Sequence, residues 1–209
     1  KYNPATDTWS VFDVTQPNAP PPLANHTAIW TGTEMLIFGG EKADHSLSAA
    51  GYRFNAATNS WSLMSNSGAP PGLHLHSATW TGTEMLIFGG QKSVPLLADP
   101  YNHDMYIYNP QSNTWRTASA INKPAGRINH TAVWTGQKLV IYGGSNFYSF
   151  NPSTAETNGG VYDVATDSWQ VNQLSGPSLS EHQAIWTGNS VLLVGLTVAE
   201  LTATIPSVT

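Results

Sequence analysis

The feature that most constrains this chain is an internal repeat with a period of about fifty residues. One segment, HTAIWTGTEMLIFGG in its first copy, occurs at residues 26–40, 76–90, 130–144 and 182–195. A second segment, YNPATDTW in its first copy, alternates with it at residues 2–9, 54–61, 108–115 and 162–169. A fixed period of this length predicts a repeat architecture, in which each copy forms one unit that buries its apolar surface against its neighbours.

The local pattern predicts four short strands in each repeat, which we name A to D in chain order. In the first segment Thr31 and Gly32 interrupt two apolar runs, as expected for a hairpin turn between strands A and B. The MLIF run of strand B is apolar at every position, which predicts burial on both faces. The second segment supplies strand C, a turn rich in Asn and Asp, and strand D beginning at a Trp. A four-stranded sheet packed between two other sheets is a propeller blade.

The paired glycines, the aromatic residue followed seven positions later by Trp, and the period together resemble the kelch repeat family. In that family the two glycines end strand B, and the aromatic residue and the Trp pack between blades. The matching positions are Gly39, Gly40, Gly89, Gly90, Gly143, Gly144, Trp9, Trp61, Trp115 and Trp169. The last copy departs from the pattern, with Leu196 where the second glycine would lie. The resemblance implies an all-β fold, a β-propeller of four-stranded antiparallel blades.

We expect a single domain over residues 1–209, with blade units at about 26–74, 76–120 and 130–174. The chain opens with a C and D strand pair and ends with an A and B pair. This order predicts that residues 1–14 complete the unit at residues 182–196 and close a ring of four blades, which removes exposed strand edges. The alternatives are that the chain is part of a larger ring, or that it self-associates with a second copy.

Composition limits the classes of partner. The net charge of -5, with eight Lys plus Arg, provides no basic stripe for a nucleic acid. No apolar run approaches the roughly 18–20 residues that span a bilayer. The absence of Cys excludes disulfides and thiolate metal sites. Sparse charge combined with many Thr, Asn and Ser residues favours an exported, extracytoplasmic protein.

The two faces of the predicted propeller differ. The turns between strands A and B and between C and D are short and repetitive, whereas the loops from B to C and from D to A are long and variable. Variable loops on a constant scaffold are typical of binding sites. Aromatic residues and Arg dominate interaction hot spots, so we predict a ligand-binding set on this face. Its members are Tyr101, His103, Arg127, Phe147 and Tyr148. The competing interpretation is that these side chains only pack their own loops.

Two repeated positions carry residues that could suggest chemistry. The histidines His26, His76, His130 and His182 share one position, and a ring of imidazoles could bind a transition metal. A nearby carboxylate is absent in three copies, and a repeated His more simply satisfies a backbone group in its own blade, so we predict no metal and no cofactor. The tryptophans Trp30, Trp80, Trp134 and Trp186 are likewise predicted to be core rather than a sugar-stacking set.

Enzymatic motifs are scarce. Galactose-oxidase-like copper enzymes share the kelch architecture, but their crosslinked Cys and Tyr cannot form without Cys. The sequence has neither HExxH nor GxSxG, and we predict no catalytic residue. We therefore predict a protein- or glycan-binding module that uses the loops from B to C and from D to A. A carbohydrate-active enzyme with carboxylates drawn from Asp99, Asp104 and Glu156 is one alternative, and a structural or assembly subunit is another.

Overall fold

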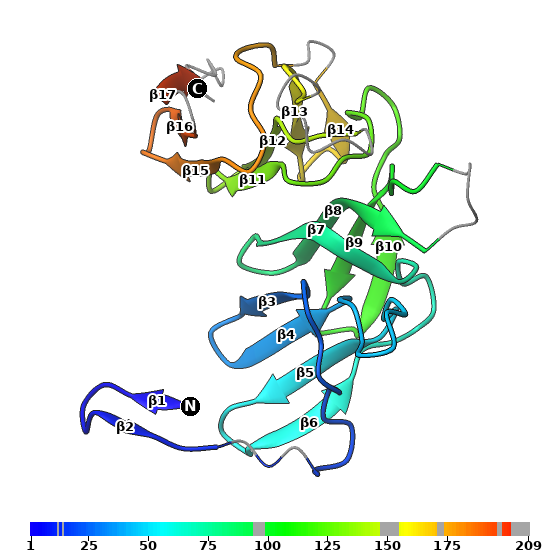
Figure 1. Ribbon diagram of the computed structural model, residues 1–209, viewed down its shortest axis with the longest axis vertical. Coiled ribbons are helices and arrows are strands. Elements are labelled where there is room, and N and C mark those ends of the chain that lie inside the picture. Colours follow the sequence, from blue (N-terminus) through cyan, green and yellow to red (C-terminus); the bar gives the residue numbers. More distant parts are fainter. Residues whose placement is uncertain are drawn as a thin grey trace.

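The computed structural model describes residues 1–11, 13, 15–93, 99–146, 155–170, 174–195 and 198–201. Every regular element in these ranges is a β-strand, and all pairs of strands are antiparallel (Figure 1). The described part of the chain contains no helix that is long and apolar enough to cross a membrane. The all-β fold predicted from the repeat is therefore confirmed.

Three four-stranded sheets follow the chain in order, and we call them blades 1, 2 and 3. Blade 1 contains β3 (Thr27–Trp30), β4 (Glu34–Phe38), β5 (Gly51–Asn55) and β6 (Ser60–Leu63). Blade 2 contains β7 (Leu73–Trp80), β8 (Met85–Lys92), β9 (Met105–Asn109) and β10 (Thr114–Thr117). Blade 3 contains β11 (Thr131–Trp134), β12 (Lys138–Tyr142), β13 (Gly159–Asp163) and β14 (Ser168–Trp169). These strands are the A, B, C and D strands expected from the sequence.

The two ends of the chain form smaller sheets. Blade 4 contains β15 (Gln183–Trp186), β16 (Val191–Val194) and β17 (Val198–Leu201), and the N-terminal hairpin contains β1 (Tyr2–Asn3) and β2 (Thr8–Trp9). The sequence predicts that this hairpin completes the last unit. In the structure Leu192 instead pairs with Glu200 of β17, and the hairpin lies at the other end of an open arc of blades (Figure 1). Ring closure therefore stays a prediction.

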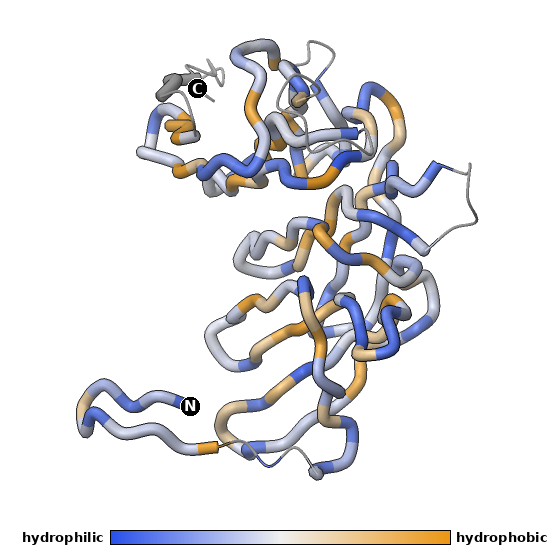
Figure 2. The backbone as a smooth tube through the Cα atoms, viewed as in Figure 1, coloured by the Kyte–Doolittle hydropathy of each residue, from blue (hydrophilic) through white to orange (hydrophobic). Residues whose placement is uncertain are grey.

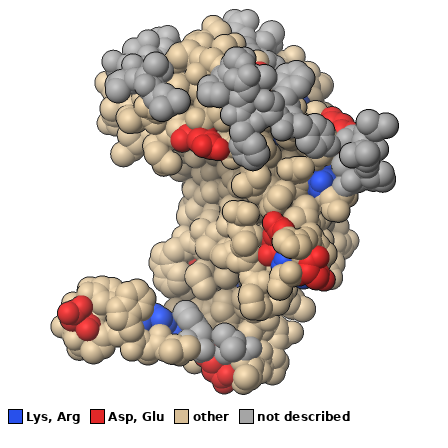
Figure 3. Space-filling view, in the orientation of Figure 1, with Lys and Arg blue, Asp and Glu red and all other residues tan. Residues whose placement is uncertain are grey.

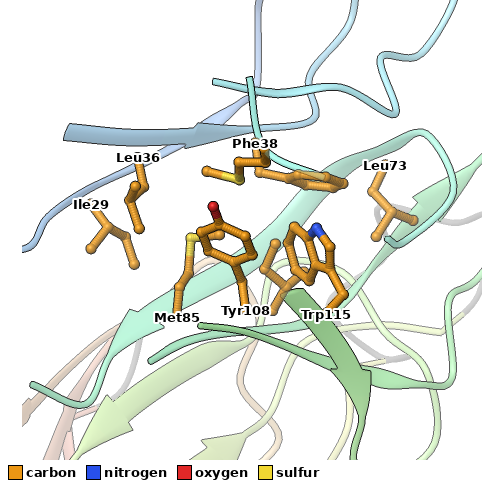
Figure 4. Close-up of a cluster of buried hydrophobic side chains, with 9 residues drawn as sticks. Ile29, Leu36, Phe38, Leu73, Met85, Tyr108 and Trp115 are labelled. Atoms are coloured by element: carbon orange, nitrogen blue, oxygen red, sulfur yellow. The ribbon is translucent and has the colours of Figure 1, made fainter. Parts of the chain in front are cut away.

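The first strands of successive blades lie side by side, β3 against β7, β7 against β11, and β11 against β15. The core is divided into three clusters, one between each pair of adjacent blades. Figure 4 shows the first cluster, where Phe38 of blade 1 meets Tyr108 and Trp115 of blade 2. Strand B contributes to two clusters at once, because Ile87 packs toward blade 1 and Phe88 toward blade 3. Hydrophobic stretches accordingly recur in each of the blades (Figure 2).

The repeated Trp of strand D ties each blade to the one before it. Trp115 is 9% exposed and its Nε1 donates to the carbonyl oxygen of Ser65 in the preceding repeat, at 2.9 Å. Trp169 is 4% exposed and donates in the same way to Ser119, at 3.1 Å. The packing of these tryptophans between blades, expected from the resemblance to kelch repeats, is confirmed at both positions.

The first glycine of each pair permits the close approach of neighbouring blades. Gly39 has a φ of +69°, and a Cβ added there would lie 2.7 Å from Cε1 of His76 and 2.5 Å from the carbonyl oxygen of Leu73. Both residues belong to the next repeat. A side chain at this position would therefore push two blades apart, in addition to straining the backbone.

Candidate interaction surface

The long loops of successive repeats meet on one face of the arc, which we call the loop face. The backbone N–H of Gly40, at the start of a loop from B to C, donates to the carbonyl oxygen of Leu73 in the next repeat, at 2.7 Å. The same bond joins Gly90 to Arg127 at 2.9 Å. Because each such loop begins against the connection from D to A of the next repeat, the loops form a continuous surface anchored by backbone hydrogen bonds.

His103 is the predicted binding residue that the structure presents to solvent. Its side chain is 42% exposed, and its Nε2 lies 2.6 Å from Oδ2 of Asp99, which is 57% exposed. The backbone N–H of Gly126 donates to Nδ1 of the ring at 3.0 Å. Nδ1 is thus an acceptor, which assigns the proton to Nε2 as the donor to Asp99. Both ring nitrogens are engaged, so the imidazole is held in one orientation and has no free nitrogen to act as a general base.

The carboxylate of Asp99 is kept ionised by its surroundings. Partial burial would raise its pKa, but hydrogen bonds from the Tyr101 backbone and from His103 outweigh that effect and lower it. Nearby, Nζ of Lys123 donates to Oδ1 of Asp104 at 2.5 Å, which joins a loop from B to C to a connection from D to A. We call Asp99, His103, Asp104 and Lys123 the blade 2 polar patch.

Arg127 and Tyr101 lie below this surface. Arg127 is 1% exposed, and Tyr101 is 5% exposed. The Arg127 guanidinium donates to three backbone carbonyl oxygens and to Oδ1 of Asn158, and burial lowers its pKa. A hot-spot residue must reach the partner, so we no longer propose direct contact for these two residues. They instead fix the loops that carry the exposed groups. Phe147 and Tyr148 lie outside the described residues.

The three carboxylates considered for a glycosidase are each committed to a local hydrogen bond. Asp99 is bonded to His103, Asp104 to Lys123, and Glu156 accepts from Nδ2 of Asn158 at 2.8 Å. A glycosidase needs one carboxyl group that holds a proton and one that does not.

A second polar cluster lies on the loop face at blade 1 and was missed by the sequence analysis. Nδ1 of His45 lies 2.5 Å from Oε1 of Glu41, and Nδ1 of His74 lies 3.8 Å from Oε2 of the same carboxylate. Nε2 of His74 is 3.4 Å from the side-chain oxygen of Gln91. In the sequence, the run EKADH at residues 41–45 indicated the pair of Glu41 and His45. His74 belongs to another repeat, and only the fold brings it next to Glu41.

The repeated histidines form contacts between blades. Nε2 of His76 is 2.8 Å from the Thr27 hydroxyl, and the same bond links His130 to Ser77 and His182 to Thr131. The expectation that each His satisfies a backbone group of its own blade fits His26, whose Nδ1 lies 3.1 Å from the Leu23 carbonyl oxygen. The other three rings bond to the preceding blade because the close approach at the glycines places them there.

Burial keeps these rings neutral. It lowers the pKa of His76 to about 4 and the pKa of His130 to about 3, with neighbouring charged groups adding to the effect. Within the described ranges no group of three or more His, Cys, Asp or Glu residues is arranged to hold a metal ion. The histidine position therefore serves the contact between blades.

Charged side chains on the face shown in Figure 3 form a few separate groups on a mostly uncharged surface. Antiparallel four-stranded sheets with their cores between them, and long loops gathered on one face, define the blades of a β-propeller. Residues 1–195 match the KLHDC2/KLHL20/DRC7 Kelch-repeats domain family. The chain belongs to the kelch repeat family, and a kelch-repeat domain is in general a protein-interaction module.

Two curated proteins are similar to part of the chain. Tip elongation aberrant protein 1 of Schizosaccharomyces pombe is 30% identical over 130 residues, which cover 61% of this chain and 11% of that protein. The Rho GTPase-activating protein gacHH of Dictyostelium discoideum is 34% identical over 109 residues, which cover 52% of this chain and 7% of that protein. The chain thus matches only a small part of the length of either relative.

Proposed function

We propose that the chain binds a protein partner through the loop face, with the blade 2 polar patch at the centre of the contact. The observation that carries the proposal is the fixed geometry of His103, which is exposed yet held by hydrogen bonds at both ring nitrogens. Side chains that are already ordered lose little conformational entropy on binding, so more of their interaction energy appears as affinity.

The patch offers both signs of charge and a neutral donor within one small area. Asp99 and Asp104 supply carboxylates, Lys123 supplies an ammonium group, and all three are between 22% and 57% exposed. A partner surface with complementary polar groups fits this arrangement, and electrostatic complementarity of this kind selects partners more than it adds affinity. The cluster of Glu41, His45 and His74 extends the polar surface toward blade 1.

A protein partner is favoured over a glycan by the position of the exposed aromatic rings. Among the described residues the strongly exposed rings are Tyr2, Trp9 and Trp30, and these lie on the N-terminal hairpin and strand β3 rather than on the long loops. A glycan-binding role for the loop face would rest on Phe147 and Tyr148.

The chain lacks Cys, so a single introduced cysteine can carry a photo-crosslinker at one chosen position. We expect a probe at Ser46, beside the loop-face patches, to capture a defined protein from the native host. Excess unlabelled wild-type chain should compete with the capture. A probe at Gln111, in the short turn of the opposite face, is the matched control and should capture little.

The captured partner then allows a direct test with purified proteins. His103→Ala should weaken its binding by more than about 1 kcal/mol, roughly fivefold or more in Kd, the range for a hot-spot residue. Gln111→Ala should leave the affinity unchanged. Equal capture by both probes, or full affinity of the His103→Ala variant, would show that the loop face is not the binding surface.

A further inference from the structure

Within the part of the chain that the structure describes, blade 1 has an apolar face that no other blade covers. In blades 2, 3 and 4 the last residue of the first strand packs into the cluster shared with the preceding blade, as Trp80, Trp134 and Trp186. Trp30 holds the same position in blade 1 and is 55% exposed. The neighbouring Ala28 on the same side of β3 is exposed as well. We call Ala28 and Trp30 the back face of blade 1.

Among the described blades, blade 4 has the complementary uncovered face. Ile185 is 62% exposed and Val194 is 53% exposed, although the residues at the same positions of blade 1, Ile29 and Phe38, are 8% and 0% exposed. In blade 1 those two residues pack against the following blade. We call Ile185 and Val194 the front face of blade 4.

The N-terminal hairpin already supplies half of a blade at the position that would precede blade 1. Lys1 Nζ donates to Oδ1 of Asn59 at 2.5 Å and lies 5.1 Å above the Phe54 ring. Arg53 has the corresponding place in blade 1, where it interacts with Tyr108 of blade 2. The hairpin thus stands where strands C and D of a preceding blade would stand. In the described structure β1 pairs only with β2, so the place for strands A and B lies open beside Trp30.

The hydrogen bond between the repeated histidine and the preceding blade can also form between these two faces. His26 is exposed, whereas His76 and His182 are buried against the blade before them. In blades 1, 2 and 3 a hydroxyl side chain forms the hydrogen bond to the histidine of the next blade. In blade 4 the residue at this position is Gln183, which is exposed. A carboxamide can donate to or accept from an imidazole nitrogen, so Gln183 suits the role of partner to His26.

We infer that the front face of blade 4 packs on the back face of blade 1 of a second copy of this chain, in the manner of the three contacts between blades within one chain. Strand β1 of that copy then pairs with β16 in place of β17. Within a single chain the two faces lie at opposite ends of the open arc (Figure 1). Two copies together supply about eight blades, which lies within the range of roughly 4 to 8 found in propellers. Two such head-to-tail contacts can therefore join the copies into a closed ring.

Sedimentation equilibrium across a wide range of concentrations tests the association, with circular dichroism to verify folding. The wild-type chain should dimerise, and Trp30→Asp and Ile185→Asp should each raise the dissociation constant by at least about tenfold, the effect of losing a central apolar anchor. An equimolar mixture of the two variants should form a heterodimer, because each supplies the intact face that the other lacks. Ile121→Asp is the matched control, since Ile121 is 74% exposed but lies on neither face.

If the wild-type chain sediments as a monomer, the inference is wrong. Thermal melting of the two variants, followed by circular dichroism, then shows whether the two faces pair within one chain. If Trp30→Asp and Ile185→Asp then lower the melting temperature, the two faces meet within one chain. If they do not, the faces do not pair at all. Failure of the mixed variants to form a complex overturns the head-to-tail arrangement. His103→Ala should leave dimerisation unchanged, so this result is independent of partner binding by the loop face.

Discussion

At the residue scale, the kelch repeat is explained by how closely adjacent blades approach. Gly39 combines a positive φ with the absence of a side chain, and the imidazole of His76 occupies the space so created. The same ring then bonds to the hydroxyl of Thr27. One contact thus couples the first glycine of the pair, the histidine and the hydroxyl residue, which explains why these residue types recur together in this chain.

Substitution of Gly39 tests this account. Gly39→Ala should lower the free energy of unfolding by about 1–2 kcal/mol, because alanine is strained in the left-handed backbone conformation of this position. It should lower it by a further 1–3 kcal/mol or so for the clash with His76 and Leu73. Gly32→Ala is the control, because Gly32 also has a positive φ but a Cβ there would meet nothing within 4 Å. Equal losses for the two variants in urea unfolding would contradict the role of close approach.

The buried histidines make stability depend on pH. Their pKa values of about 4 for His76 and about 3 for His130 lie below the ordinary value of 6.5, so the unfolded chain binds more protons as the pH falls below 6.5. Stability is therefore fully present above pH 6.5 and decreases as the pH falls toward those values, by about 2 kcal/mol per histidine at pH 5.

Urea unfolding at pH 7 and pH 5 measures this change. His76→Gln should reduce the difference between the two free energies of unfolding. An unchanged pH dependence in the His76→Gln variant would show that the His76 ring does not resist protonation in the folded state.

At the element scale, the buried apolar clusters lie between adjacent blades rather than within one blade. Blades 2 and 3 each contribute one face to the cluster before them and the other to the cluster after them, as strand β8 does through Ile87 and Phe88. In a repeat protein of this kind stability is approximately the sum of the terms for each repeat and each contact between neighbours. A side chain at such a contact therefore contributes more to the free energy of unfolding than an identical side chain at an uncovered end.

The repeated Trp provides the comparison. Trp115→Ala should lower the free energy of unfolding by ~3–5 kcal/mol, because it empties a large site between blades 1 and 2 and leaves the Ser65 carbonyl without its donor. Trp9→Ala removes the same side chain at a position that is 80% exposed in a single chain, and in the monomeric Ile185→Asp background it should cost less than about 0.5 kcal/mol. Similar melting temperatures for the two variants would contradict the assignment of Trp115 to the core between blades.

At the scale of the whole molecule, the arc presents two different kinds of surface. The loop face carries the polar patches proposed to bind a partner, and the uncovered faces of blades 1 and 4 carry the apolar side chains proposed to join two copies. The two sets share no residue. Crosslinking from the loop face and sedimentation therefore test separate properties, and a variant at one surface serves as a control for the other.

The sequence by itself determined the repeat, the strands and the burial of strand B. The prediction that Trp30 is core was wrong, because in the described structure no blade packs on that side of β3 and the side chain is 55% exposed. The apolar run of strand B, the turn at Thr31 and Gly32, and the Trp that begins strand D are local patterns, and each predicted its element because hydrophobic periodicity and turn chemistry act over a few residues. The family and the all-β blades followed from the same patterns.

Only the tertiary structure decided which loop residues are available and what the histidines contact. Arg127 and His103 are both polar residues in long loops, but one is 1% exposed and the other has a side chain 42% exposed. His76 bonds to a hydroxyl 49 positions away. Exposure and partners of this kind depend on contacts between distant repeats. The spacing of residues along one strand or loop carries no information about them, because that spacing fixes only local geometry.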